Sequence, residues 1–184
     1  MDSPGDASVI PEPAQQARIA DAPWFNALWF QATWFCAVLG RDTLLPLTAG
    51  LILLHLALAR DLKSELLQLS GVALIGITVD ACLSAGGFYL FEDGVLVPLW
   101  LCCLWLAFAT TLRRSLAFFG PRPALTALAG AVVLPFNYLV GARLGAVEFG
   151  HALPLTFIVV GVAWALLLPA LYRMAAFIHE ADKS

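Results

Sequence analysis

Asp80 is the residue whose type and position point most directly to chemistry. It lies near the middle of the apolar stretch LLQLSGVALIGITVDACLSAGGFYLF, which is long enough to cross a bilayer. A carboxylate at the centre of a membrane helix costs about 2.5 to 3.5 kcal/mol on insertion scales, so such residues usually face a bundle interior and pair there. Two interpretations follow. Asp80 either locks helix packing through hydrogen bonds, or it carries a proton or holds a polar group of a ligand.

Other polar side chains are predicted to share the depth of Asp80. Counting inward from the outer end of each apolar run, at 1.5 Å per residue, places Asp80, Gln31 and Asn137 about 13 to 15 Å deep. Tyr138 and the indole N–H of Trp105 fall near the same level. We therefore expect a polar layer in which Asp80 comes within hydrogen-bond reach of at least one of these residues, because an unpaired carboxyl at that depth is too unfavourable.

Charged residues at the predicted outer rim include Arg41, Arg143, Glu148 and His151. Glu148 and His151 have the i, i+3 spacing through which two side chains on a helix share a metal ion in di-iron bundles. Only one such pair exists, beside Gly150, so we expect no metal and no other cofactor. The cysteines lie inside apolar runs and show no C-x-x-C spacing, which is typical of buried thiols.

The composition places these residues in a membrane protein. Of 184 residues, 61% are hydrophobic and 12% are charged, with a mean hydropathy of +0.85. An ordinary soluble domain is about 45 to 50% apolar and about 25% charged, so a soluble fold is excluded. The lipid bilayer is the expected partner, with a membrane protein or a second copy of the chain as further candidates. The basic residues form no patch suited to nucleic acid.

Charged and Gly/Pro-rich breaks divide the chain into six apolar runs, at about 23–40, 43–59, 66–90, 95–112, 124–146 and 152–172. The predicted fold class is all-α: a polytopic membrane protein with a bundle of six transmembrane helices in one domain, residues 23–172. Residues 1–22 are polar, acidic and Pro-rich, which predicts a disordered cytosolic leader. Residues 173–184 are the predicted cytosolic tail.

The basic residues predict the orientation of these helices. With the N-terminus in the cytoplasm, eight basic residues fall in inside segments, and only Arg41 and Arg143 fall outside. Such a bias in short loops indicates that both termini are cytoplasmic. The expected location is therefore the bacterial inner (cytoplasmic) membrane, crossed several times.

The chain resembles an uncharacterised family of small bacterial inner-membrane proteins, a domain of unknown function. The resemblance is carried by WFQATWF in the first run, PLWLCCLWLAFATTL in the fourth and FNYLVGARLGAV in the fifth. It extends over nearly the whole chain after residue 22. It implies a membrane location, and it implies no activity, substrate or cofactor.

Two classes of function remain open at this point. The first is a protein without catalysis of its own that binds a small amphipathic or lipid-like ligand between its helices, or acts as a membrane partner subunit. The second is an intramembrane lipid-modifying or proton-coupled enzyme or transporter that uses Asp80, assisted by Asn137 and Arg143. The sequence contains no phosphate loop, no H-E-x-x-H and no G-x-S-x-G, so none of these motifs assigns an enzyme class.

Overall fold

The computed structural model describes residues 22–181 and is all-helical, which confirms the all-α part of the predicted fold class for these residues. The helices are α2 (Pro23–Gly40), α3 (Leu45–Ala57), α4 (Leu62–Ala85), α5 (Leu99–Thr111), α6 (Pro123–Arg143) and α7 (Leu153–Ala181). Two short 3₁₀ helices lie between them, η1 (Glu92–Gly94) and η2 (Ala117–Phe119). The predicted leader falls on residues 1–21, outside the described residues, apart from its last residue, Ala22.

Three helices within the described residues are long and apolar enough to cross a membrane: α4, α6 and α7. The helices α3 and α5 have 13 residues each. At 1.5 Å per residue they are about 20 Å long, shorter than the hydrocarbon core of about 30 Å. The 18-residue helix α2 contains three tryptophans, Asn26 and Gln31, which lower its mean hydropathy. The six predicted apolar runs therefore correspond to six helices of unequal length.

Local chemistry explains where two of these helices begin or end. Pro98 directly precedes α5, since proline suits the start of a helix and fits poorly in its interior. At the other end of α5, the hydroxyls of Thr110 and Thr111 donate to the carbonyl oxygens of Ala107 and Phe108. The helix α7 runs past the predicted boundary at residue 172, because its next turns still pack inward: Ala175 is buried.

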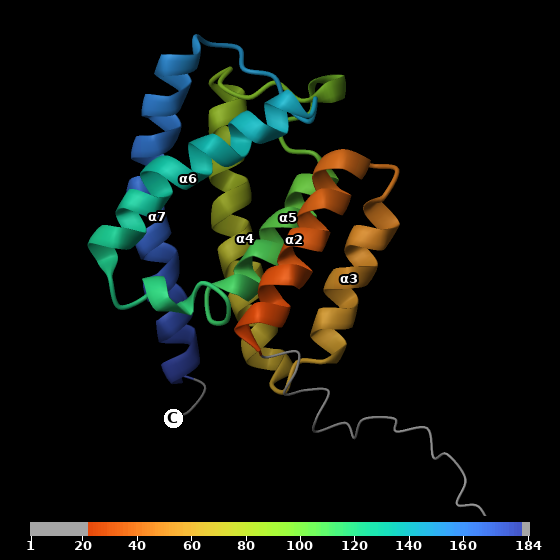
Figure 1. The fold of residues 1–184 in the computed structure, drawn as a ribbon, viewed down its shortest axis with the longest axis vertical. Helices are drawn as coiled ribbons and strands as arrows, with labels where there is room; N and C mark the ends of the chain where they lie inside the picture. Colours follow the sequence, from red (N-terminus) through yellow and green to blue (C-terminus); the bar gives the residue numbers. More distant parts are fainter. Residues whose placement is uncertain (1–21, 182–184) are drawn as a thin grey trace, which may run out of the picture.

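The helices alternate in direction, so the connections between them gather at two ends of the molecule (Figure 1). These ends differ in their number of basic residues. The helix α2 begins and α7 ends at the same end of the molecule, which we call the basic end. It contains six of the described basic residues: Arg60, Lys63, Arg113, Arg114, Arg122 and Arg173. Arg41 and Arg143 lie at the opposite end, which we call the rim end.

The helices form two groups that face each other. The helix α2 packs on α5, and α3 and α4 also pack on α5, while α6 packs along α7. Figure 1 shows α6 crossing obliquely beside α7, on the side away from α3. The helix α4 joins the groups, since it contacts both α5 and α7.

Glycine sets the distance between α6 and α7. A Cβ atom added at Gly130 of α6 would collide with the backbone carbonyl oxygen of Trp164 in α7. One added at Gly161 of α7 would lie 2.9 Å from the carbonyl oxygen of Ala131. Small residues of this kind allow the backbones of membrane helices to approach closely. The two helices consequently form a tightly packed hairpin.

We expect Gly130→Ala to destabilise the protein by roughly 1 to 3 kcal/mol, because the added methyl group must push α6 away from α7. The measurement is thermal unfolding in a mild detergent. The matched control is Gly50→Ala in α3, where an added Cβ meets nothing within 4 Å. Alanine there should be neutral or stabilise the helix by about 0.5 to 1 kcal/mol. Equal melting temperatures for the two variants would contradict the close approach of α6 and α7.

Candidate functional site

Asp80 is completely buried, and two side chains from other helices donate to it. The indole Nε1 of Trp105 in α5 lies 2.7 Å from Oδ2 of Asp80. The hydroxyl of Tyr138 in α6 donates to the same oxygen at 2.5 Å. The hydrogen bond predicted for Asp80 is therefore present with two of the four candidate partners. It joins α4, α5 and α6 at a single carboxyl group.

The residue one turn before Asp80 makes this arrangement sterically feasible. Gly76 is buried on the same face of α4, and a Cβ atom added there would collide with the ring of Trp105. The absence of a side chain lets the indole lie flat against the α4 backbone, with its N–H directed at Asp80. The four-residue spacing between Gly76 and Asp80 thus positions the acceptor beside its donor.

Two further aromatic residues enclose the carboxyl group and its donors. The ring of Tyr89 stacks on Tyr138, with centroids 4.3 Å apart, and Trp164 stacks on Trp105 at 4.8 Å. Both outer rings are completely buried. Among residues 22–181, Oδ1 of Asp80, the Tyr89 hydroxyl and Nε1 of Trp164 are buried without a hydrogen-bond partner. Hydrogen-bonding capacity therefore remains at this centre after the helices have packed.

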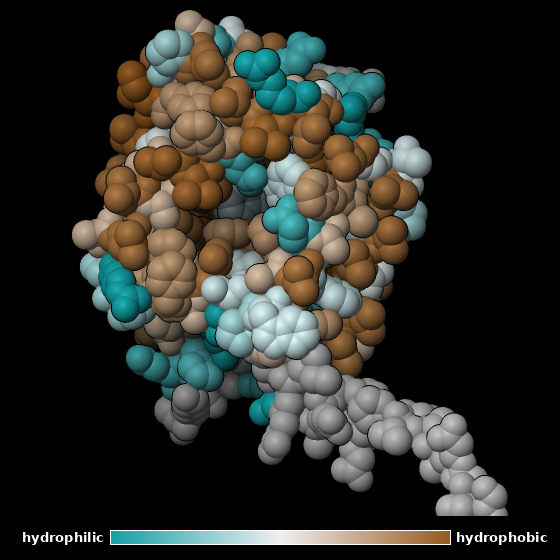
Figure 2. Space-filling view, in the orientation of Figure 1, coloured by the Kyte–Doolittle hydropathy of each residue, from teal (hydrophilic) through white to brown (hydrophobic). Residues whose placement is uncertain are grey.

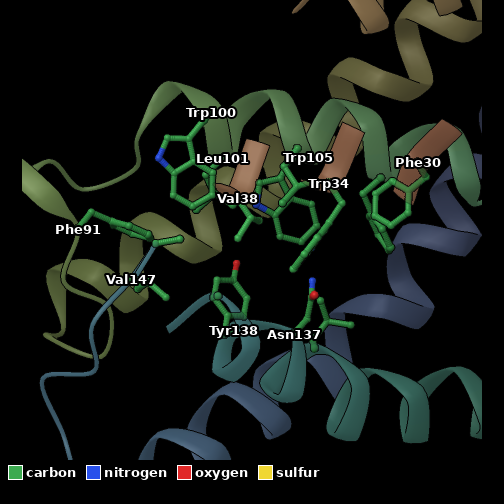
Figure 3. Close-up of a pocket in the computed structure, with 15 residues that line it drawn as sticks. Phe30, Trp34, Val38, Phe91, Trp100, Leu101, Trp105, Asn137, Tyr138 and Val147 are labelled. Atoms are coloured by element: carbon green, nitrogen blue, oxygen red, sulfur yellow. The ribbon is translucent and has the colours of Figure 1, made fainter. Parts of the chain in front are cut away.

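A narrow pocket with a volume of about 50 Å³ lies between α2, α5 and α6 and reaches this centre. Figure 2 shows a hollow near the middle of one face, bordered by hydrophobic and by more hydrophilic side chains. The walls are mainly aromatic and aliphatic, and Figure 3 shows them from inside. The aromatic lining residues, apart from Tyr138, are Phe30, Trp34, Phe91, Trp100, Trp105 and Phe108. The pocket is thus an apolar chamber with the hydrogen-bonded Asp80 centre beside it.

Asn137 and Tyr138 bring polar atoms to the wall that α6 contributes. Both side chains point from α6 toward α5 in Figure 3. Tyr138 is engaged with Asp80. Asn137 is half-buried, and the hydrogen bonds found among residues 22–181 do not involve its amide. Of the residues predicted to form the polar layer, Asn137 therefore lies in the wall of the pocket and does not bond to Asp80.

Gln31 does not join this layer, in contrast to the prediction. Its side chain is exposed on α2, while its neighbours Phe30 and Trp34 line the pocket. The position of a side chain on a helix depends on its depth along the axis and on its angle around the axis, which changes by about 100° from one residue to the next. That rotation directs Gln31 away from the face that carries Phe30 and Trp34.

The predicted rim residues form separate contacts. Arg41 donates to Glu92 at 2.9 Å, and Arg143 is exposed. The backbone of Glu148 forms an antiparallel bridge with Leu90.

His151 lies 3.0 Å through Nε2 from the carbonyl oxygen of Gly86. Glu148 and His151 thus belong to an extended connection, where the helical i, i+3 geometry for sharing a metal does not apply. The part of the chain that the structure describes contains no group of three potential metal ligands.

A buried ionic cluster at the basic end was missed by the sequence interpretation. Glu65 of α4 accepts from Arg114 at 2.8 and 3.0 Å and lies 2.8 Å from Nε2 of His55 in α3. The Glu65 side chain is only 6% exposed. Next to this cluster, Asn26 donates to Thr110 and accepts from the Ser115 hydroxyl. Glu65, Gln68, Gly76 and Asp80 lie at intervals that return to one helix face, and this spacing is the sequence signal that could have indicated the cluster.

The comparisons with known proteins agree with a family that has no established activity. No curated protein and no solved structure matches the chain. A family model described as "Protein of unknown function (DUF2878)" matches residues 23–170, a segment that contains the whole Asp80 centre and the pocket. The chain therefore belongs to the DUF2878 family, as its resemblance to an uncharacterised membrane-protein family had indicated.

Proposed function

We propose that this protein is a multi-pass membrane protein that binds a small amphipathic, lipid-like molecule in the pocket between α2, α5 and α6, without catalysis of its own. The observation that carries the proposal is the pocket itself. It combines aromatic walls with two adjacent polar groups, Asn137 and Tyr138. Ligand sites in proteins typically have this composition, with an apolar lining and few convergent polar groups.

The polar groups favour an uncharged head group on the ligand. The Tyr138 hydroxyl uses its hydrogen on Asp80, so its remaining lone pair can only accept. The Asn137 amide offers two donor hydrogens and one acceptor oxygen. No basic side chain lines the pocket within the described residues. A hydroxyl or amide group of the ligand would complement these atoms better than a phosphate or an ammonium group.

The location of the pocket also favours a lipid-like ligand. It opens between helices that expose large apolar side chains, such as Leu28 of α2 and Phe136 and Val133 of α6. In a membrane such side chains meet acyl chains, so a molecule dissolved in the bilayer can reach the pocket from the side. A membrane partner subunit or a second copy of the chain could cover the same side chains.

Filling the pocket should abolish ligand retention. Gly141 lines it, and an added Cβ there meets only Val147, at an ordinary contact distance of 3.7 Å. We expect Gly141→Leu to fold normally and to lose lipid-like molecules that co-purify with wild type, as measured by native mass spectrometry in detergent.

Gly50→Leu is the matched control, because its side chain enters open space. This variant should retain the ligand. Unchanged retention by Gly141→Leu would contradict the pocket assignment.

The proposed topology has six membrane-crossing helices, with both termini in the cytoplasm of a bacterium and the chain in its inner membrane. The grouping of basic residues at the end where α2 begins and α7 ends supports this orientation. The short helices α3 and α5 would reach both surfaces with the help of their flanking turns.

Reporter fusions test this orientation. Alkaline phosphatase, which requires the periplasm, should be inactive when fused at either terminus and active when inserted next to Gly94, at the rim end. A fluorescent protein that matures only in the cytoplasm should give the opposite pattern. Phosphatase activity at a terminal fusion would refute the proposed orientation.

The unpartnered Oδ1 of Asp80 supports a second candidate function, a proton-coupled or lipid-modifying activity. Asp80 and Tyr138 would carry it, with Asn137 holding the substrate. Arg143 is exposed at the end of α6 and has no part in this version. The two candidates differ in whether Asp80 must be able to release a proton.

Substitutions at Asp80 distinguish these candidates. The amide oxygen of Asp80→Asn can accept both hydrogen bonds, so its melting temperature should stay within a few degrees of wild type. Asp80→Leu leaves Trp105 and Tyr138 without an acceptor and should lose roughly 1 to 3 kcal/mol of stability. If Asp80 only holds the helices and the pocket in place, Asp80→Asn will complement a gene deletion. Loss of complementation at normal expression and melting temperature would instead establish the proton-dependent function.

A further inference from the structure

Arg113, which closely follows α5, is held by three side chains, none of which is a carboxylate. Its guanidinium donates to Oε1 of Gln68 at 3.0 Å, to the Ser64 hydroxyl at 3.3 Å, and to Nδ1 of His179 at 2.8 Å. Its neighbour Arg114 differs, because that guanidinium is paired with Glu65. Among residues 22–181, the contacts of Arg113 include no carboxylate.

The guanidinium of Arg113 therefore keeps unused donors and an uncompensated charge. Arginine has five N–H donors, and the three bonds above leave about two of them free. The side chain is half-buried, where a charge without a counter-charge is unfavourable. The bonds from α4 and α7 also fix the orientation of the guanidinium, so its remaining donors point in a constant direction.

A second pocket adjoins this guanidinium. It is an open cleft of about 350 Å³ between the segment after α5 and the last turns of α7. Arg113 and His179 contribute its polar wall, and Tyr172, Ala175 and Ala176 contribute an apolar wall from α7. The Tyr172 hydroxyl donates to the carbonyl oxygen of Leu116, which ties the segment to the helix. The walls of this pocket are therefore held in place by a hydrogen bond, and the pocket is separate from the chamber between α2, α5 and α6.

The surroundings of this second pocket favour an anion that is attached to a lipid. Arg60, Lys63, Arg122 and Arg173 lie at the same end of the molecule, which raises the local concentration of anions. Exposed aromatic rings of Phe118 and Phe177 lie on the two elements that flank the pocket. They provide an apolar surface for acyl chains beside the charged site. Basic pockets between membrane helices on the cytoplasmic side are typical sites for anionic head groups.

We propose that the pocket at Arg113 binds a phosphate-bearing anion, supplied by the head group of an anionic phospholipid. The planar guanidinium matches phosphate oxygens, which accept two parallel N–H bonds. This site is independent of the ligand proposed for the chamber between α2, α5 and α6.

Thermal unfolding of the full chain in a neutral detergent tests this site. Short-chain phosphatidylglycerol should raise the melting temperature of wild type by several degrees, whereas phosphatidylcholine at the same concentration should not. Arg113→Gln should lose this rise. Arg143→Gln should keep it, because Arg143 is exposed at the rim end, away from this pocket.

A second pair of variants leaves the Arg113 contacts intact, in case Arg113→Gln folds poorly. Ala176→Phe places a ring in the pocket and should abolish the rise, whereas Ala170→Phe, an exposed position outside the pocket on the same helix, should keep it. Gly141→Leu should also keep it, which separates this site from the first pocket.

Inorganic phosphate identifies the source of the anion. If inorganic phosphate alone raises the melting temperature as much as phosphatidylglycerol does, the site is supported and its ligand is the soluble anion. An equal rise with phosphatidylcholine, no rise with either anion, or a full rise in Ala176→Phe would each overturn the proposal.

Discussion

The burial of one carboxyl group among apolar helices governs how the rest of this structure is arranged. Hydrocarbon offers no water to a polar side chain, so donors must come from the protein. Trp105 and Tyr138 supply them from two different helices, and both address the same oxygen of Asp80. That requirement determines which faces of α5 and α6 turn toward α4. It also explains the bare backbone at Gly76, where the indole ring needs the space of a side chain.

The helix α4 organises polar contacts at two depths. Near the rim end it presents Asp80, and at the basic end it presents Glu65 and Gln68 to the arginines that follow α5. Gln68 also donates to the carbonyl oxygen of Ala109, one of the last carbonyls of α5. Apolar packing alone would let two smooth helices slide or rotate relative to each other. Directional bonds near both ends of α4 remove that freedom, so the α4–α5 pair has one register.

The apolar runs predict the number and order of the helices because each charged or Gly/Pro-rich break interrupts the sequence clearly. Helix depth also predicts the partners of Asp80, since rise per residue is constant. The direction in which a side chain points around the helix axis also depends on which face of the helix packs inward, and a count along the axis does not give this. Gln31 was placed wrongly for this reason. The cluster around Glu65 escaped prediction for another reason. Glu65 lies near a turn, where a charged side chain is usually exposed to solvent. Only the folded structure shows that Arg114 and His55 pack against it and that it is buried.

The tight packing of α6 on α7 affects how the pocket between α2, α5 and α6 can change its width. Because Gly130 and Gly161 bring the two backbones together, α6 and α7 form one closely packed unit. The helix α6 meets the other wall of the pocket chiefly through the Tyr138 hydroxyl, near the rim end. At the basic end, the Tyr172 hydroxyl donates to the carbonyl oxygen of Leu116 and Arg113 donates to His179, so α7 is also bonded to the segment that follows α5. The chamber is therefore braced at both of its ends, and a ligand must match a width that the helix packing has already set.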